Sequence, residues 1–316
     1  MDPGNPLDSD VANHLAFLSV QCELSASSLR VRRAAIGSTL AAFGNTVLSY
    51  SQVVSNVIKA TALRRAKCKT RMPDWDLLVI LNYLSSDRFE PLASAPLAQL
   101  TIKTCFLVML ASGRRASEVN NLSGLLGDVS READGSFTLN FLPEFLAKNQ
   151  KPDTPSPSIR IPPLSDIISR TEPDILNCPV RALTLYRNRT HHIRSRGQRA
   201  LFLSLNPMYT QDIRVLSISR WMKSLILDAY LHWGSQETVT PHVLELRRAR
   251  VHEIRSWSSS MAAQSIPLHK VLQAASWSDP DVFISFYLRD VARRRENGLW
   301  GLPSMVAAQS TIPATR

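Results

Sequence analysis

The stretch Leu97-Ala-Gln-Leu-Thr-Ile-Lys-Thr-Cys-Phe-Leu-Val-Met-Leu-Ala111 is the most apolar part of the chain. Its length and apolar content predict a buried helix at the centre of a domain core. Gly113 can end this helix as a C-cap, and Ala116 or Ser117 can open a short helix after it. The longest clear apolar run, residues 105–111, is well short of the roughly 18 residues of a membrane span, so we expect none.

Downstream of this helix the pattern changes to strands. Gly135-Ser-Phe-Thr-Leu-Asn-Phe-Leu142 alternates apolar with polar residues, and so does Ser158-Ile-Arg-Ile-Pro162. A Pro/Asp/Ser-rich turn separates them, which predicts a β-hairpin with Lys148 and Lys151 in or near its turn. Helical patterns return in the rest of the chain, at residues 178–189, 216–231, 242–263, 268–275 and 279–295. The predicted fold is mainly α with a small antiparallel β-sheet.

Upstream of the apolar helix, residues 75–84 predict another helix, which Asp74 can cap. Before it, Pro73 ends a run of basic residues that we expect to link two domains. The predicted organisation has a disordered end, a small helical domain, a basic linker, a larger domain and a C-terminal tail, at residues 1–10, 11–63, 64–73, 74–296 and 297–316. In the small domain, Ser25 can cap the second helix and Gly44 can end it.

The charge of the chain points to a polyanionic partner. Lys and Arg total 37 residues against 26 Asp and Glu, which gives a formal net charge of +11. Such an excess most often indicates nucleic acid, although it can also serve solubility alone. The charge is clustered, as in a protein that closes around DNA. The candidate DNA contacts are Arg30, Arg33, Arg64, Arg65, Lys67, Lys69, Arg71, Lys151, Arg247 and Arg248. For Arg30 and Arg33, a solvated helix face is the alternative.

Several common sites are missing from the sequence. It has no phosphate loop, no GxGxxG motif between a strand and a helix, and no GxSxG elbow. The four scattered cysteines lack metal-ligand spacing and indicate reduced thiols of an intracellular protein, and the polar N-terminus has no secretory pattern. No group of acidic residues clearly suits Mg²⁺. Chemistry on a phosphate would therefore depend on Arg, Lys, His and a side-chain nucleophile.

Four motifs occur in a suggestive order. Arg115 lies in Ala-Ser-Gly-Arg-Arg-Ala-Ser-Glu-Val, and His252 and Arg255 face the same way at i and i+3 on a helix. Trp277 follows in Gln-Ala-Ala-Ser-Trp-Ser-Asp, and Tyr287 in Phe-Ile-Ser-Phe-Tyr-Leu-Arg-Asp-Val. This series resembles the tyrosine recombinase family, to which phage integrases belong. It is most similar to members carried by eukaryotic DIRS-, Ngaro- or Crypton-type mobile elements. The resemblance runs from about residue 75 to residue 293, with a weaker resemblance at residues 11–63. It implies a tyrosine recombinase catalytic domain at residues 74–296, preceded by a small helical core-binding domain that binds DNA at residues 11–63.

The resemblance implies roles for the upstream residues. Arg115 matches the first arginine of the family, whereas Arg114 occupies a variable position of the same motif. Glu118 matches the acidic residue that supports that arginine. Lys148 matches the lysine that protonates the leaving oxygen. Lys151 is the alternative, because the register of the hairpin cannot be fixed from sequence.

The downstream residues complete the implied site. His252 and Arg255 match the His-x-x-Arg pair, Trp277 stands where the family has His or Trp, and Tyr287 matches the nucleophile. The implied enzyme cuts and rejoins DNA through a 3′-phosphotyrosyl intermediate, without metal, ATP or another cofactor. The implied partners are double-stranded DNA and further copies of the chain in a synaptic complex. A role in DNA recombination and integration, a transposable-element origin and a nuclear location are also implied.

Other interpretations stay open at this point. Trp277 and Tyr287 can be packing aromatics, and His252 and Arg255 can be an exposed pair on a solvated helix. The N-terminal helical region is shorter than the family pattern, which suits a catalytically silent DNA-binding relic of a mobile element. A type IB topoisomerase would use the same chemistry without synapsis.

Overall fold

A computed structural model of the chain divides into two compact units, Met1–Thr70 and Arg71–Arg316. It describes residues 6–44, 51–64, 75–147, 158–164, 175–206, 208–234, 246, 249–264, 266–275 and 283–284. The described part is mainly helical with one small antiparallel sheet, as the sequence predicts. The predicted linker at residues 64–73 falls almost wholly outside these ranges; only Arg64 is described.

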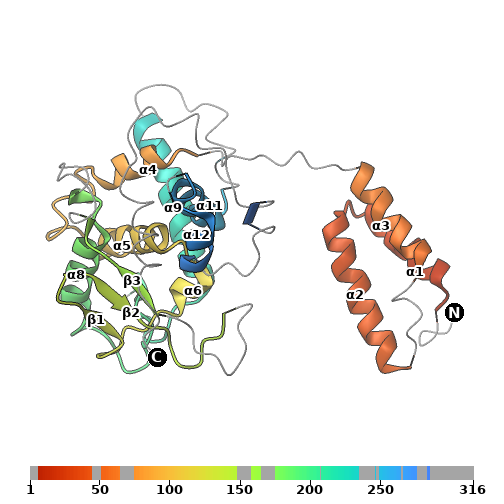
Figure 1. Ribbon diagram of the computed structural model, residues 1–316, viewed down its shortest axis with the longest axis horizontal. Helices are drawn as coiled ribbons and strands as arrows, with labels where there is room; N and C mark the ends of the chain where they lie inside the picture. The colour runs from red at the N-terminus through yellow and green to blue at the C-terminus, as the bar shows by residue number, and fades with distance from the viewer. Residues whose placement is uncertain are drawn as a thin grey trace. The chain divides into compact units, whose positions relative to one another are not determined.

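Helix α5 (Leu97–Ser112) is the centre of the larger unit. It is buried from Leu100 to Ser112, with Ile102 the one partly exposed residue, as its apolar sequence predicts. The sheet and α8 (Pro179–Thr190) lie on one side of α5, and α9 (Val215–Gly234) and α11 (His252–Ala262) on the other (Figure 1). The other helices of this unit are α4 (Leu77–Leu84), α6 (Ala116–Asn120) and α12 (Leu268–Ala274).

The sheet contains the predicted hairpin and one more strand. Strands β2 (Phe137–Leu139) and β3 (Ile159–Ile161) pair antiparallel, with Phe137 opposite Ile161 and Leu139 opposite Ile159. These four apolar residues are buried, and β3 contacts α5, so the alternation places one face of the hairpin on the core. The additional strand, β1 (Val129–Arg131), pairs with the other edge of β2.

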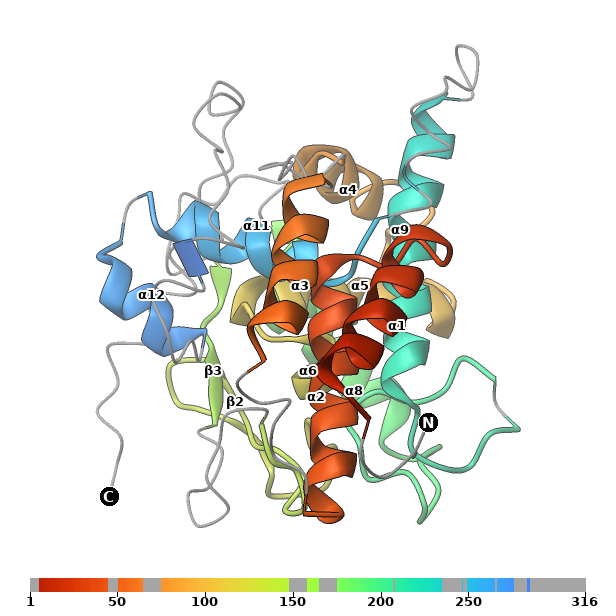
Figure 2. The same ribbon diagram turned by 90° about the vertical axis from the view of Figure 1, so that its right-hand side faces the viewer.

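The smaller unit is a bundle of α1 (Asp8–Val20), α2 (Ala26–Ala42) and α3 (Gln52–Arg64), each of which contacts the other two (Figure 2). Its core contains Leu15, Leu29 and Leu40 from the predicted apolar positions. Ser25 caps α2 by accepting a hydrogen bond from the backbone of Ser28, and Gly44 follows the helix with φ +83°, as expected.

The structure differs from the local predictions at four points. Residues 8–10, predicted to belong to a disordered end, are the first residues of α1. The helix predicted at residues 242–263 is interrupted, because Ala249 and Arg250 are not helical and α11 begins at His252. The cap of α4 is Asp76, whose carboxylate accepts the backbone N–H of Leu78 at 2.9 Å, whereas Asp74 was expected. Strand β1 was not predicted, because only Val129 of its three residues is buried and so it has no apolar alternation.

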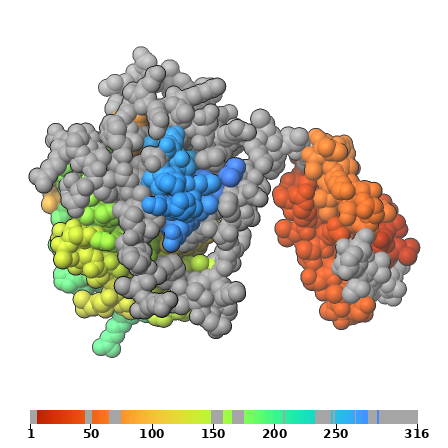
Figure 3. Space-filling view, viewed as in Figure 1, coloured from red at the N-terminus to blue at the C-terminus, as the bar shows by residue number. Residues whose placement is uncertain are grey.

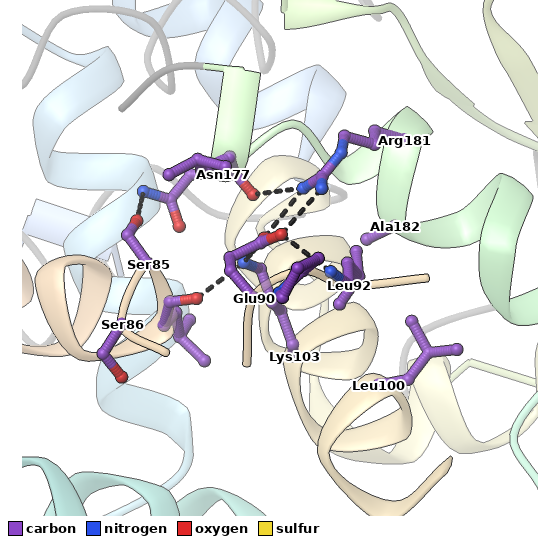
Figure 4. A network of polar contacts seen from close by, with 12 residues as sticks. Ser85, Ser86, Glu90, Leu92, Leu100, Lys103, Asn177, Arg181 and Ala182 are labelled. Carbon is purple, nitrogen blue, oxygen red and sulfur yellow. Dashed lines mark hydrogen bonds and ion pairs between the residues drawn. The ribbon is translucent and has the colours of Figure 1, made fainter. Parts of the chain in front are cut away.

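A buried charge cluster fixes the middle of α5. Lys103, with no exposed surface, donates to Glu90 and to the carbonyl of Leu84, both at 2.6 Å (Figure 4). Arg181 of α8 binds both oxygens of the same carboxylate at 2.8 and 2.7 Å. Burial alone would raise the pKa of Glu90, but the hydrogen bonds from Arg181 and Lys103 lower it to about 2. The cluster therefore joins α5 to α8 through paired charges.

None of the helices among the described residues combines the length and the apolar character that crossing a membrane would require.

Acid should weaken the larger unit through Glu90. Its folded pKa of about 2 lies below the ordinary 4.5, so its stabilising contribution is present above pH 4.5 and is lost as the pH falls toward 2. We expect about 2 kcal/mol at neutral pH, less than the full shift implies because the carboxylate keeps some contact with solvent. Urea unfolding of the wild type and Glu90→Gln at neutral pH and near pH 3 measures this contribution. The difference between the free energies of unfolding of the two proteins should be smaller near pH 3 than at neutral pH.

The matched control is Glu144→Gln. Glu144 pairs with Arg199 on the surface, where the two side chains are 52% and 47% exposed. We expect a loss below about 0.5 kcal/mol from this variant and no comparable change with pH. A difference between wild type and Glu90→Gln that is as large near pH 3 as at neutral pH would contradict the role of Glu90.

Candidate active site

The segment between α5 and α6 positions the first predicted site residue. Gly113 ends α5 in the left-handed conformation, with φ +59°, and its N–H donates to the carbonyl of Met109. Arg115 is the N-cap of α6, and Glu118, in the first turn of that helix, accepts the backbone N–H of Arg115 at 2.8 Å. A carboxylate in the first turn also interacts favourably with the helix dipole. The backbone around Arg115 is therefore held from both sides.

Glu118 brings two predicted arginines together. Its Oε1 accepts from Nη1 of Arg115 at 2.9 Å, and its Oε2 is 3.5 Å from Nη1 of Arg255 on α11, which lies 137 residues further along the chain. Glu118 is 2% exposed and Arg255 is fully buried. Removing such charges from water is costly unless they pair. The pairing with Glu118 thus explains how two cations can lie next to each other at this point of the fold.

Arg114 and Arg115 have different surroundings. The side chain of Arg115 is 26% exposed, so it can reach a ligand while it contacts Glu118. Arg114 is 4% exposed and lies over the ring of Phe141, at 5.9 Å from the ring centroid. Burial lowers the pKa of Arg114, and the charge of Glu118 opposes this. Of the two, Arg115 has the side chain suited to bind a ligand.

Helix α11 carries the second predicted motif. His252 is its first residue and is exposed, and Arg255 follows one turn later on the same side of the helix. The residues after Arg255 up to Ala262 are all buried, with four serines among them. The helix therefore presents an exposed imidazole at its start and a covered guanidinium one turn on.

The end of α5 packs closely against this helix. A Cβ added at Gly113 would lie 3.3 Å from Cβ of Ala275 and 3.4 Å from Oγ of Ser258. The absence of a side chain at this position thus lets the start of the Arg115 segment approach α11 and the residue after α12. Helix α12 lies at the surface of the larger unit, where Leu268, His269 and Gln273 are exposed. The C-terminal described helices appear in blue in Figure 3.

Sequence reasoning missed two residues that hold α11. Oε2 of Glu253 accepts from the indole N–H of Trp75 at 2.9 Å and from the backbone N–H of Arg250 at 3.0 Å. Trp75 is fully buried, and its ring centroid lies 6.0 Å from that of Trp257 on the same helix. The position of Glu253 beside His252 was the available signal, but nothing in the sequence connects it with Trp75.

The remaining predicted site residues lie outside the described ranges. These are Lys148, Lys151, Trp277 and Tyr287, together with the candidate DNA contacts Arg65, Lys67, Lys69, Arg71, Arg247 and Arg248. Near Tyr287, Phe283 and Ile284 are helical, and Phe283 is buried. Three candidate DNA contacts are described in the smaller unit. Arg30 and Arg64 are exposed, whereas Arg33 is partly buried and donates to Oγ of Ser55 at 3.0 Å.

A metal centre finds no support among the described residues. They contain no group of three or more His, Cys, Asp or Glu side chains that could hold a metal ion. The rings of His191 and His192 lie edge to face, 5.0 Å apart, and form no part of such a group. The groups gathered around Glu118 are cations instead, and these favour an anionic ligand.

Comparison with known proteins identifies no family: neither a scan against models of protein families nor a search of curated proteins finds a match. The interpretation of the site therefore depends on its geometry and on the order of the motifs in the sequence.

A double-mutant cycle tests the pairing at Glu118. Glu118→Gln leaves the buried charge of Arg255 without its carboxylate, so we expect a loss of about 3 kcal/mol in the free energy of unfolding. In the Arg255→Met background the same change should cost roughly 1–3 kcal/mol less, because the charge is gone. Urea unfolding of the four proteins measures the coupling.

The exposed pair of Arg199 and Glu144 provides the matched cycle. We expect coupling between Arg199→Met and Glu144→Gln of less than about 1 kcal/mol. Equal coupling in the two cycles would mean that the contact of Arg255 with Glu118 contributes no more than a surface ion pair.

Proposed function

We propose that the chain is a DNA strand-transferase of the tyrosine recombinase type, which cuts and rejoins DNA through a phosphotyrosyl bond. The observation that carries this proposal is the convergence of Arg115 and Arg255 on Glu118, with His252 one turn from Arg255. The order of the motifs in the sequence predicts the same residues. Two arginines and a histidine drawn from distant parts of the chain suit the recognition of one phosphodiester.

The electrostatics agree with phosphate chemistry. Attack on a phosphodiester builds negative charge on the non-bridging oxygens, and guanidinium groups fixed in advance stabilise that charge as it develops. Glu118 holds Arg115 through two hydrogen bonds, one from its backbone and one from its side chain. A restrained guanidinium loses little conformational freedom when the transition state forms. This arrangement can supply the stabilisation that metal ions supply in other phosphoryl-transfer enzymes.

In the proposed reaction the phosphoryl group passes between hydroxyl oxygens, and water is not a reactant. The phenol oxygen of Tyr287 forms a bond to phosphorus, the bond from phosphorus to the 5′ oxygen breaks, and His252 takes the phenol proton. Lys148, or Lys151 in its place, gives a proton to the departing 5′ oxygen. A 5′-hydroxyl of another strand then attacks the phosphorus and gives its proton to the lysine, which the first step left neutral. The bond from phosphorus to the Tyr287 oxygen breaks, and His252 returns its proton to that oxygen. The energy of the phosphodiester is kept in the covalent intermediate, so the reaction needs no ATP.

The exposure of the two arginines indicates an order of engagement. Arg115 is partly exposed and can meet a phosphate at once, whereas Arg255 is covered. Contact between Arg255 and DNA therefore requires a local rearrangement that exposes its guanidinium group. A net charge of +11 favours initial attraction to DNA, and synapsis would need further copies of the chain on the same DNA.

Covalent trapping tests the function. A suicide substrate with a nick beside the cleavage site loses its short 5′-hydroxyl fragment, so a covalent intermediate accumulates on a denaturing gel. Wild type should form the adduct and Tyr287→Phe should not. Arg115→Ala should slow adduct formation about 100-fold or more, because one stabilising donor is lost. Arg199→Ala, which removes an exposed arginine elsewhere, should leave the rate within about twofold of wild type.

Other outcomes identify the alternatives. An adduct formed by Tyr287→Phe would exclude Tyr287 as the nucleophile. Salt-dependent DNA binding with no adduct on any substrate would favour a silent DNA-binding relic. Relaxation of supercoiled DNA by a single copy, without synapsis, would favour a topoisomerase.

A further inference from the structure

We propose that Trp75 and Glu253 are positioning residues that hold the first turn of α11 and thereby fix His252 for the reaction. This inference rests on the proposed strand-transfer function. Neither residue belongs to the motifs that suggested that function. The contact joins Trp75, which precedes α4, to Glu253 in the first turn of α11, 178 residues further along the chain.

Helix α11 lacks the usual means of fixing its start. Its N-cap residue, Val251, makes no side-chain capping hydrogen bond. Glu253 acts in its place: Oε2 accepts the backbone N–H of Arg250 at 3.0 Å, while the N–H of Glu253 donates to the carbonyl of Arg250 at 2.9 Å. These reciprocal hydrogen bonds close the turn that contains His252. The negative charge of Glu253 in the first turn stabilises the helix further through its dipole.

Trp75 fixes the carboxylate that closes this turn. Its indole N–H donates to the same Oε2 of Glu253 at 2.9 Å. The indole is fully buried, so its orientation is set by the core rather than by solvent. The adjacent residue, Asp76, is also held, because its backbone N–H donates to the hydroxyl of Tyr230 at 2.6 Å. A rigid donor therefore determines where the carboxylate, and with it the turn, can lie.

The consequence for His252 follows from its place in the turn. It lies between Arg250 and Glu253, so a shift of that turn moves its imidazole, which is exposed and held by less of the core than Arg255. A displacement of about 1 Å at a reacting group can cost up to about 100-fold in rate. Loss of the Trp75 hydrogen bond should thus affect His252 more than the buried part of α11.

Trp257 provides a matched control within the same contact. Its ring packs against that of Trp75, and the two side chains are 1% and 0% exposed. Among the described residues, however, the indole N–H of Trp257 has no hydrogen-bond partner. Trp75→Phe and Trp257→Phe therefore create similar cavities, but only Trp75→Phe removes a hydrogen bond to Glu253.

The experiment compares these two variants in the full chain. The rate of adduct formation on the nicked substrate should fall about tenfold in Trp75→Phe, with unchanged DNA affinity, and less than about twofold in Trp257→Phe. In a His252→Ala background, Trp75→Phe should have no further effect on the residual rate, because its effect acts through His252. Hydrogen exchange of the backbone amides at residues 249–256 should be about tenfold faster in Trp75→Phe alone.

Failure of this inference can be distinguished from failure of the proposed function. If wild type forms no adduct, the proposed function fails, and hydrogen exchange still tests the positioning by Trp75 in the free protein. Equal exchange at residues 249–256 in the two tryptophan variants would overturn the inference. If wild type is active, the inference is also overturned by equal rate losses in both variants, or by a Trp75→Phe effect that persists without His252.

Discussion

The carboxylate of Glu118 is the acceptor on which the candidate site depends. It is buried and contacts guanidinium groups from α6 and α11, whose like charges would otherwise repel each other in a medium of low dielectric constant. Only a short turn of chain separates Glu118 from Gly113, which ends α5. The contact of Arg255 with Glu118 therefore requires α11 to pack against α5. Packing of α11 against α5 therefore also places the two arginines beside Glu118.

Helix α5 supports a second buried charge cluster of a different kind. Lys103 and Arg181 share Glu90, and Arg181 binds both oxygens of this carboxylate. Exposure does not separate the two clusters, because the side chain of Arg181 is 29% exposed and that of Arg115 is 26% exposed. The Glu90 cluster joins α5 to α8, whereas the Glu118 cluster gathers arginines from two of the motifs that the sequence singles out. Membership of these motifs, rather than burial, exposure or a lowered pKa, distinguishes the candidate site from a structural ion-pair network.

The sequence was sufficient for the parts of the fold that follow local rules. The apolar run of α5, the Ser25 cap, the Gly113 terminus and the β2–β3 hairpin each have a local signal, and each is observed. The Arg115 and Arg255 motifs could also be recognised in the sequence. The resemblance implied that Glu118 supports Arg115, but the sequence did not indicate that Glu118 also contacts Arg255. The bond from Trp75 to Glu253 could not be predicted, because it depends on how distant segments pack. The break before α11 could not be predicted for the same reason. The helical pattern of the sequence continues across the break, where the side chain of Glu253 closes a turn by accepting the backbone N–H of Arg250.

The demands on α11 explain why its anchors matter. The helix must hold Arg255 in the core and His252 at the surface, only three residues apart. The buried segment is fixed by close packing, since the approach at Gly113 leaves little room beside Ser258. In the first turn, Val251 and Ile254 are buried in the core, but His252 is exposed and Glu253 is only partly buried. This outer side of the turn depends on directional hydrogen bonds to Glu253. Under the proposed function, Trp75 and Glu253 set the geometry at His252 without a chemical role of their own, and substitutions at these residues should slow the proposed strand transfer before they alter the fold.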